Sequence, residues 1–142
     1  MTHVVGRDSA VATRVERYAG LYGWTVERAG GEWRLCFGNG LAGVFVPAAV
    51  VPETMAALRS QDALGPVIEL SGPPSGSVFL AERNGQVLSS RDLPVGVRVL
   101  DCPQQVPIPP PGGYSAQARW AVPPDRAHRV LPLVATVIAA KR

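Results

Sequence analysis

The chain has 142 residues, of which 46% are hydrophobic and 18% charged, and its formal net charge is +3. This length is typical of one domain with a single core, and so apolar a composition excludes an intrinsically disordered chain. No apolar run approaches the roughly 20 residues of a membrane-spanning helix, and the first residues lack a signal-peptide pattern, so we expect a cytoplasmic protein without membrane contact.

The first predicted elements are a helix and a β-hairpin. After a short flexible N-terminal tail, Asp8 or Ser9 is placed to cap an amphipathic helix that extends to Tyr22. Residues 24–28 and 32–37 then alternate between apolar and polar side chains around a Gly-Gly pair, which predicts two antiparallel strands joined by a tight turn. We expect the helix to pack on the apolar face of this hairpin.

The middle of the chain predicts a buried strand and a second helix. The nearly continuous apolar run over 41–46 is typical of a central strand that is covered on both faces. Pro52 and Glu53 suit the first turn of the next helix, where a backbone N–H has no partner within the helix. A short strand over 67–70 completes a strand-helix-strand order.

The second half of the chain predicts further strands and a third helix. The strands are expected over residues 77–82, 86–89, 97–100 and 116–122. Asn84-Gly85 is a strong hairpin signal between the first two strands, and Pro132 suits the start of a C-terminal helix. Together these elements predict an α+β fold, in which residues 1–142 form a single domain with a mixed or mainly antiparallel sheet packed with about three helices.

Prolines dominate the segment over 106–111. Proline has no backbone N–H, so this segment is expected at a sheet edge or in a polyproline II conformation and not in a central strand. A polyproline II segment is preformed and loses little entropy on binding. Two interpretations stay open, a rigid connection at the edge of the sheet and a docking site for a protein partner. The candidate docking residues are Pro107, Pro109, Pro110 and Pro111.

Few residues suit catalysis or metal binding. His3 lies in the N-terminal tail and His128 just before the last helix, so neither suits a nucleophilic triad. The sequence has neither the spaced carboxylates of a two-metal site nor cysteine spacing typical of zinc, so we expect no metal and no cofactor. Cys36 and Cys102 are expected to be buried free thiols.

The positive charge is concentrated in the second half of the chain. Residues 71–142 carry eight Lys or Arg against four Asp or Glu. The planar guanidinium of arginine matches the geometry of phosphate, so this excess permits contacts to nucleic acid or a nucleotide. The candidate residues for such contacts are Arg83, Arg91, Arg98 and Arg119.

Five short segments occur together in one order along the chain. They are residues 19–24 (AGLYGW), 43–47 (GVFVP), 64–67 (LGPV), 106–111 (VPIPPP) and 119–124 (RWAVPP). In these segments, which span about residues 18–124, the chain resembles the N-terminal domain of the actinobacterial bifunctional DNA primase/polymerase proteins. The resemblance implies a fold of the archaeo-eukaryotic primase group.

The positions that match the catalytic residues of that family are changed in this sequence. The resemblance implies metal-binding acids on the strand over 43–46, where this chain has none, and a histidine on the strand over 77–80, where it also has none. Arg98 is nearest to the later acidic position. The resemblance therefore implies a primase-polymerase-like scaffold without its catalytic residues.

Three hypotheses of function follow. The leading one is a non-catalytic regulatory or assembly module that acts through contacts with a protein partner or with itself. The alternative is a protein that binds nucleic acid or a nucleotide with its basic second half. The third is an enzyme that uses Glu69, Glu82 or Asp101 as a general acid or base, which requires the fold to bring the acid into a pocket.

Overall fold

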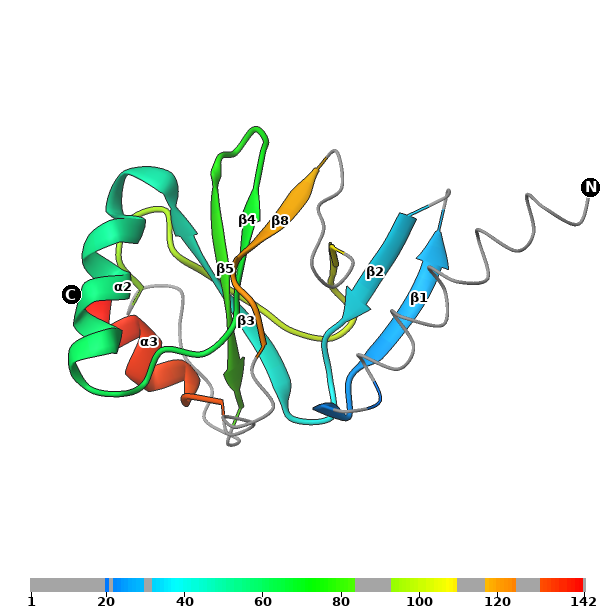
Figure 1. The fold of residues 1–142 in the computed structure, drawn as a ribbon, viewed down its shortest axis with the longest axis horizontal. Coiled ribbons are helices and arrows are strands. Elements are labelled where there is room, and N and C mark those ends of the chain that lie inside the picture. Colours follow the sequence, from blue (N-terminus) through cyan, green and yellow to red (C-terminus); the bar gives the residue numbers. More distant parts are fainter. Residues whose placement is uncertain are drawn as a thin grey trace, which may run out of the picture.

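In the computed structural model, residues 20, 22–29, 32–83, 93–109, 117–124 and 131–141 are described. Their strands form two antiparallel sheets (Figure 1). The smaller sheet has the order β1 (Thr25–Ala29), β2 (Glu32–Cys36) and β7 (Gln105–Pro107). The larger sheet has the order β6 (Arg98–Leu100), β3 (Leu41–Pro47), β5 (Gly76–Glu82), β4 (Val67–Leu70) and β8 (Ala118–Val122).

The helices lie on one face of the larger sheet, and the smaller sheet lies on its other face (Figure 1). A short 3-10 helix, η1 (Ala48–Val50), leads into α2 (Val51–Ser60), which has a proline in its first turn. The chain ends in α3 (Val134–Lys141), which packs on α2 and on the central strands β3 and β5. The order of layers is therefore helices, larger sheet and smaller sheet.

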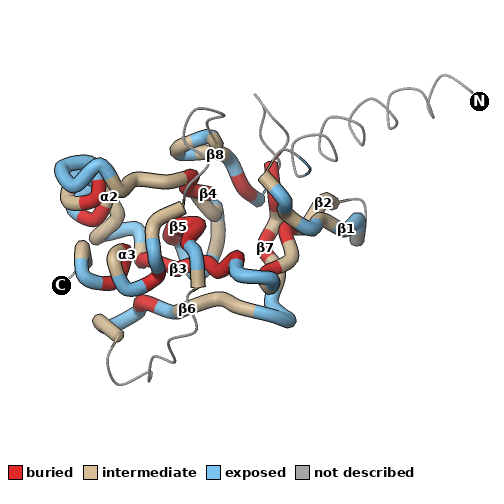
Figure 2. Tube along the Cα trace, turned by 90° about the horizontal axis from the view of Figure 1, so that it is seen from below, coloured by how far each residue is buried: buried red, intermediate tan, exposed pale blue. Residues whose placement is uncertain are grey.

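Two apolar cores follow from the alternation of side chains along β3. Leu41 and Phe45 belong to the core between the two sheets, together with Leu35 and Val106 of the smaller sheet. Val44 and Val46, on either side of Phe45 in the chain, belong to the core under the helices. Figure 2 shows the buried positions concentrated along β3 and β5. Because both faces of β3 are covered, its sequence is apolar without interruption.

A tight turn directs the chain from the smaller sheet into the larger one. Gly38, Asn39 and Gly40 between β2 and β3 have φ angles of 135°, 52° and 90°. The left-handed region is accessible to glycine at little cost and is tolerated by asparagine better than by most residues. The backbone of Gly38 bonds to that of Leu41 in both directions, which closes the turn.

The expectation of one sheet packed with about three helices is wrong. The described residues form two antiparallel sheets with eight strands in all, and the helices that pack on the larger sheet are α2 and α3, with the single turn η1 before α2. The apolar face of the β1–β2 hairpin explains the difference, since it packs against the larger sheet through Leu35. Alternation along a strand shows which face is buried and not which element covers it.

Several of the other predicted elements are confirmed. The β1–β2 hairpin, the central position of β3, the helix that begins near Pro52 and the C-terminal helix are all present. The predicted helix from Asp8 or Ser9 lies almost entirely outside the described residues. The first strand of the predicted Asn84-Gly85 hairpin is present as β5, whereas its turn and its second strand over 86–89 lie outside the described residues. No helix in the described ranges has the length and apolar character needed to cross a membrane.

Candidate binding cleft between the two sheets

A cleft of about 600 Å³ lies where the smaller sheet meets the edge of the larger one. Its walls are β6, β7, the turn between them and the β4–β5 connection. The lining residues are Phe45, Leu70, Ser71, Gly72, Pro73, Pro74, Arg98, Leu100, Gln104, Gln105, Val106, Pro107 and Gln117. Two other clefts lined by described residues have about 300 and 270 Å³, so this one is the largest of the three.

The lining of the cleft combines an apolar surface with neutral polar groups. Phe45 and Val106 are buried in the core between the sheets, so the bottom of the cleft is continuous with that core. Three glutamines and Ser71 are among the lining residues, although the amide of Gln105 donates to Glu27 at 2.9 Å and the side-chain oxygen of Gln104 accepts from the backbone of Asp101. Such a mixture is typical of binding sites, because apolar area supplies affinity and a few polar groups supply orientation.

Arg98 is the charged side chain of this lining. It lies exposed on β6, directly opposite Phe45 on β3 in the strand register. Its guanidinium carbon is 5.1 Å from the centroid of the Phe45 ring, a distance that permits a cation–π contact. In the described part of the chain, no carboxylate pairs with Arg98.

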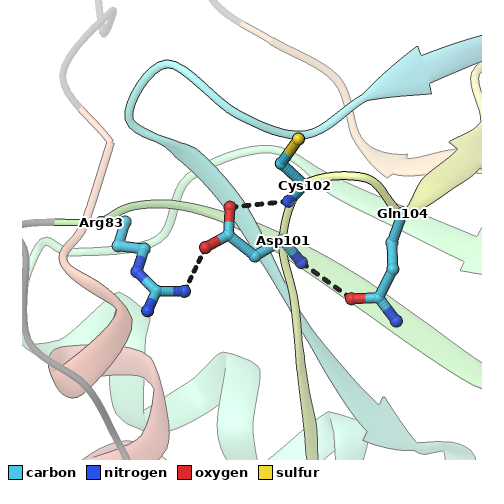
Figure 3. A network of polar contacts seen from close by, with 4 residues as sticks. All are labelled: Arg83, Asp101, Cys102 and Gln104. Atoms are coloured by element: carbon cyan, nitrogen blue, oxygen red, sulfur yellow. Dashed lines mark hydrogen bonds and ion pairs between the residues drawn. The ribbon is translucent and has the colours of Figure 1, made fainter.

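Arg83 has a different role, because it is bonded inside the protein. Its guanidinium pairs with the carboxylate of Asp101, which also accepts from the backbone N–H of Cys102 at 2.8 Å (Figure 3). The backbone N–H of Asp101 donates to the side-chain oxygen of Gln104 at 2.9 Å. These contacts hold the β6–β7 turn, which forms one wall of the cleft.

Arg119 is also paired. It lies opposite Glu69 in the register of β8 and β4, and its guanidinium bonds to that carboxylate. The hydrogen bond to Glu69, followed by the negative charge of Glu69, raises the pKa of Arg119. The structure thus separates the predicted arginines, since Arg83 and Arg119 have carboxylate partners and Arg98 has none among the described residues. Arg91 lies outside the described residues.

The proline segment lies at a sheet edge where it is described. Pro107 is the last residue of β7, which pairs with β2 alone in the described part. Pro109 is buried, and its carbonyl accepts a hydrogen bond from the indole N–H of Trp120 at 3.2 Å. Pro107 also lines the cleft. Pro110 and Pro111 lie outside the described residues.

The two cysteines are free, as expected, but only one of them is partly buried. Cys36 is half-buried at the end of β2, and its sulfur accepts from the side-chain amide of Gln105 at 3.4 Å. Burial, followed by the charge of Glu27 and a hydrogen bond to it, raises the pKa of Cys36. Cys102 is exposed in the β6–β7 turn, so the expectation that both thiols are buried is wrong.

The three acids proposed for catalysis do not form one site. Glu69 is bonded to Arg119, Asp101 is bonded to Arg83, and Glu82 is exposed at the end of β5. Within the ranges that the structure describes, no three His, Cys, Asp or Glu side chains are grouped to hold a metal ion. None of these carboxylates lines the inter-sheet cleft, whereas Glu82 lines the cleft of about 300 Å³.

The sequence gives no direct signal for the cleft. The charge of Arg98 makes it a candidate for ligand contact, whereas nothing in the sequence indicates the glutamines or the β4–β5 connection. Those residues come together because β6 pairs with β3 in one sheet and β7 pairs with β2 in the other. Pairing between strands that are distant in the sequence leaves no local pattern. Comparison with known proteins finds no matching family model, no matching curated protein and no matching solved structure.

Proposed function

We propose that the chain is a non-catalytic regulatory or assembly module that acts in the cytoplasm by contacting a partner protein through the inter-sheet cleft. The observation that carries this proposal is the cleft itself. It joins an apolar bottom, neutral amides and one arginine to the edge of β7. Strand edges beside apolar grooves are common docking places for extended peptide segments, which add their backbone to the sheet.

The arrangement of charged groups also favours binding over catalysis. General acid–base catalysis needs a titratable group placed where a substrate can bind. Here Glu69 and Asp101 are engaged by arginines, and neither carboxylate lines the cleft. A scaffold related to the primase-polymerase group, with its catalytic positions changed, is compatible with this proposal, because function resides in sites and not in the fold.

Nucleic-acid binding is the second candidate, and Arg98 is the residue that favours it. Electrostatic binding to a phosphate backbone needs several unpaired cations close together. Of the arginines predicted to make such contacts and described here, two form internal ion pairs. A salt titration against labelled single-stranded DNA tests this candidate, since affinity from phosphate contacts falls steeply as salt rises.

The experiment for the leading proposal is selection of peptides from a random display library on the intact protein. A blocking variant, Gly72→Trp, places a large ring in the cleft. A Cβ at Gly72 meets nothing within 4 Å and its φ is not in the left-handed region, so the fold should tolerate the change. Gly20→Trp is the matched control, because Gly20 also has open space around it and does not line the cleft.

The proposal predicts peptides that bind the wild type and Gly20→Trp with equal affinity and lose at least tenfold in affinity on Gly72→Trp. Selection of peptides that bind all three proteins equally would place the contact elsewhere. Repeated failure to select any peptide would contradict the cleft as a protein-binding site.

A further inference from the structure

The edge of β7 has a hydrogen-bonding pattern that restricts what can bind beside it. The backbone N–H of Ile108 donates to the carbonyl of Trp33 across the β2–β7 ladder at 3.0 Å. In an antiparallel pair, the backbone groups of successive residues point alternately toward the partner strand and away from it. The backbone groups of Gln105 and Pro107 therefore point away from β2, and both residues line the cleft.

This edge offers more acceptors than donors. Pro107 has no N–H, so it presents a carbonyl alone, whereas Gln105 presents both groups. The carbonyl of Pro109 already accepts from Trp120, which ends the available edge. A second copy of the same edge would bring the same shortage of donors, and prolines at sheet edges prevent such pairing. The occupant that fits is a short extended segment of a different chain, with its own N–H groups free.

The charge of the cleft defines the occupant further. Arg98 is the charged side chain in the lining, which contains no Asp or Glu. Its guanidinium lies over the Phe45 ring, and in the described residues it has no carboxylate partner. A partly apolar surround strengthens the attraction between an arginine and a carboxylate, because water screens the pair less. Charge complementarity therefore favours an acidic occupant.

We propose that the cleft binds a short, extended, acidic peptide segment of a partner protein. One carboxylate of the segment pairs with Arg98, and N–H groups of alternate residues donate to the carbonyls of Gln105 and Pro107. Apolar side chains of the intervening residues pack on the apolar lining of the cleft. This inference rests on the proposed function and adds the chemistry of the partner.

The test uses defined peptides and the isotope-labelled intact protein, with NMR shifts as the readout. The first probe is a capped hexapeptide of alternating Glu and Val, and the charge control replaces Glu by Lys. Two more probes carry N-methyl groups on either the Glu or the Val residues. Because N–H groups on one side of an extended chain belong to alternate residues, one methylated peptide loses the bonds to β7 and the other keeps them.

The expected result is saturable binding of the Glu-Val peptide with a dissociation constant on the order of 0.1–1 mM, as suits a short peptide that is ordered on binding. The shifted amides should include those of Gln105 and Val106. Arg98→Ala should weaken binding by about tenfold, the size expected for one charge-assisted contact. Arg59→Ala is the matched control, since Arg59 is exposed on α2 and does not line this cleft.

Equal binding of the Lys-Val peptide, or equal binding of both methylated peptides, would overturn the inference. Tighter binding of a thymidine hexanucleotide that depends on Arg98 would overturn it in favour of a phosphate ligand. The acidic peptide could fail to bind while library peptides without Asp or Glu still bind the wild type and lose affinity on Gly72→Trp. That result would refute this inference and leave the proposed function intact.

Discussion

Gly76 provides a quantitative test of how closely β5 packs against β3. A Cβ built on Gly76 would lie against the carbonyl oxygen of Val46 and 2.6 Å from Cζ of Phe45. The oxygen belongs to the backbone of a central strand and cannot rotate away, and Phe45 is buried in the core between the sheets. Substitution Gly76→Ala must therefore separate β5 from β3 and also displace that ring.

Overpacking of this kind typically costs about 1–3 kcal/mol, and the fixed oxygen places Gly76→Ala near the upper end, at about 3 kcal/mol. For a chain of 142 residues, a loss of that size corresponds to a fall in melting temperature of roughly 6–12 °C. With a denaturant slope of about 2 kcal/mol/M, the urea midpoint should fall by about 1.5 M.

Equilibrium urea denaturation, followed by tryptophan fluorescence, measures this loss directly. Gly72→Ala is the matched control, because a Cβ there meets nothing within 4 Å. Its free energy of unfolding should change by less than about 0.5 kcal/mol or rise slightly, since alanine restricts the unfolded chain. If Gly76→Ala unfolds at the same urea concentration as Gly72→Ala, the close contact between β5 and β3 is refuted.

Three further predictions concern other contacts. Trp120→Phe keeps an aromatic ring but removes the indole donor to the carbonyl of Pro109. It should lower the free energy of unfolding, measured by urea denaturation, by about 0.5–1.5 kcal/mol. An unchanged free energy of unfolding would mean that this hydrogen bond does not stabilise the fold. Leu58→Ala empties a fully buried position on α2 and should cost about 2–5 kcal/mol, measured in the same way. With a disulfide reagent at pH 8, the exposed Cys102 should react faster than Cys36, whose pKa is raised by burial and a nearby carboxylate, because a higher pKa leaves less thiolate. Replacing Cys102 by serine should remove the fast phase, and loss of the slow phase instead would contradict this order.

Local patterns predicted those elements that depend on nearby residues. The apolar run of β3, the alternation of the β1–β2 hairpin and the proline at the start of α2 each identify their element within a few positions. Each signal arises from burial or from a backbone constraint inside one segment, so no knowledge of distant partners is needed.

The division into two sheets and the cleft between them could not be predicted in this way. Phe45 and Arg98 become neighbours because β3 pairs with β6 across a long stretch of chain. The sequence around either residue does not indicate that the other lies beside it. The ion pairs of Arg83 and Arg119 have the same origin, since they depend on which strands lie together. Counting arginines therefore overestimated the positive charge that is available to a ligand.

The most direct test of the central claim is a paired titration of a cleft-selected peptide and labelled single-stranded DNA against the wild type, Gly72→Trp and Gly20→Trp. A protein-binding cleft predicts that peptide affinity falls at least tenfold in Gly72→Trp alone and that DNA binds weakly to all three proteins. Equal peptide affinity for all three, or DNA binding that Gly72→Trp removes and salt suppresses steeply, would contradict the claim.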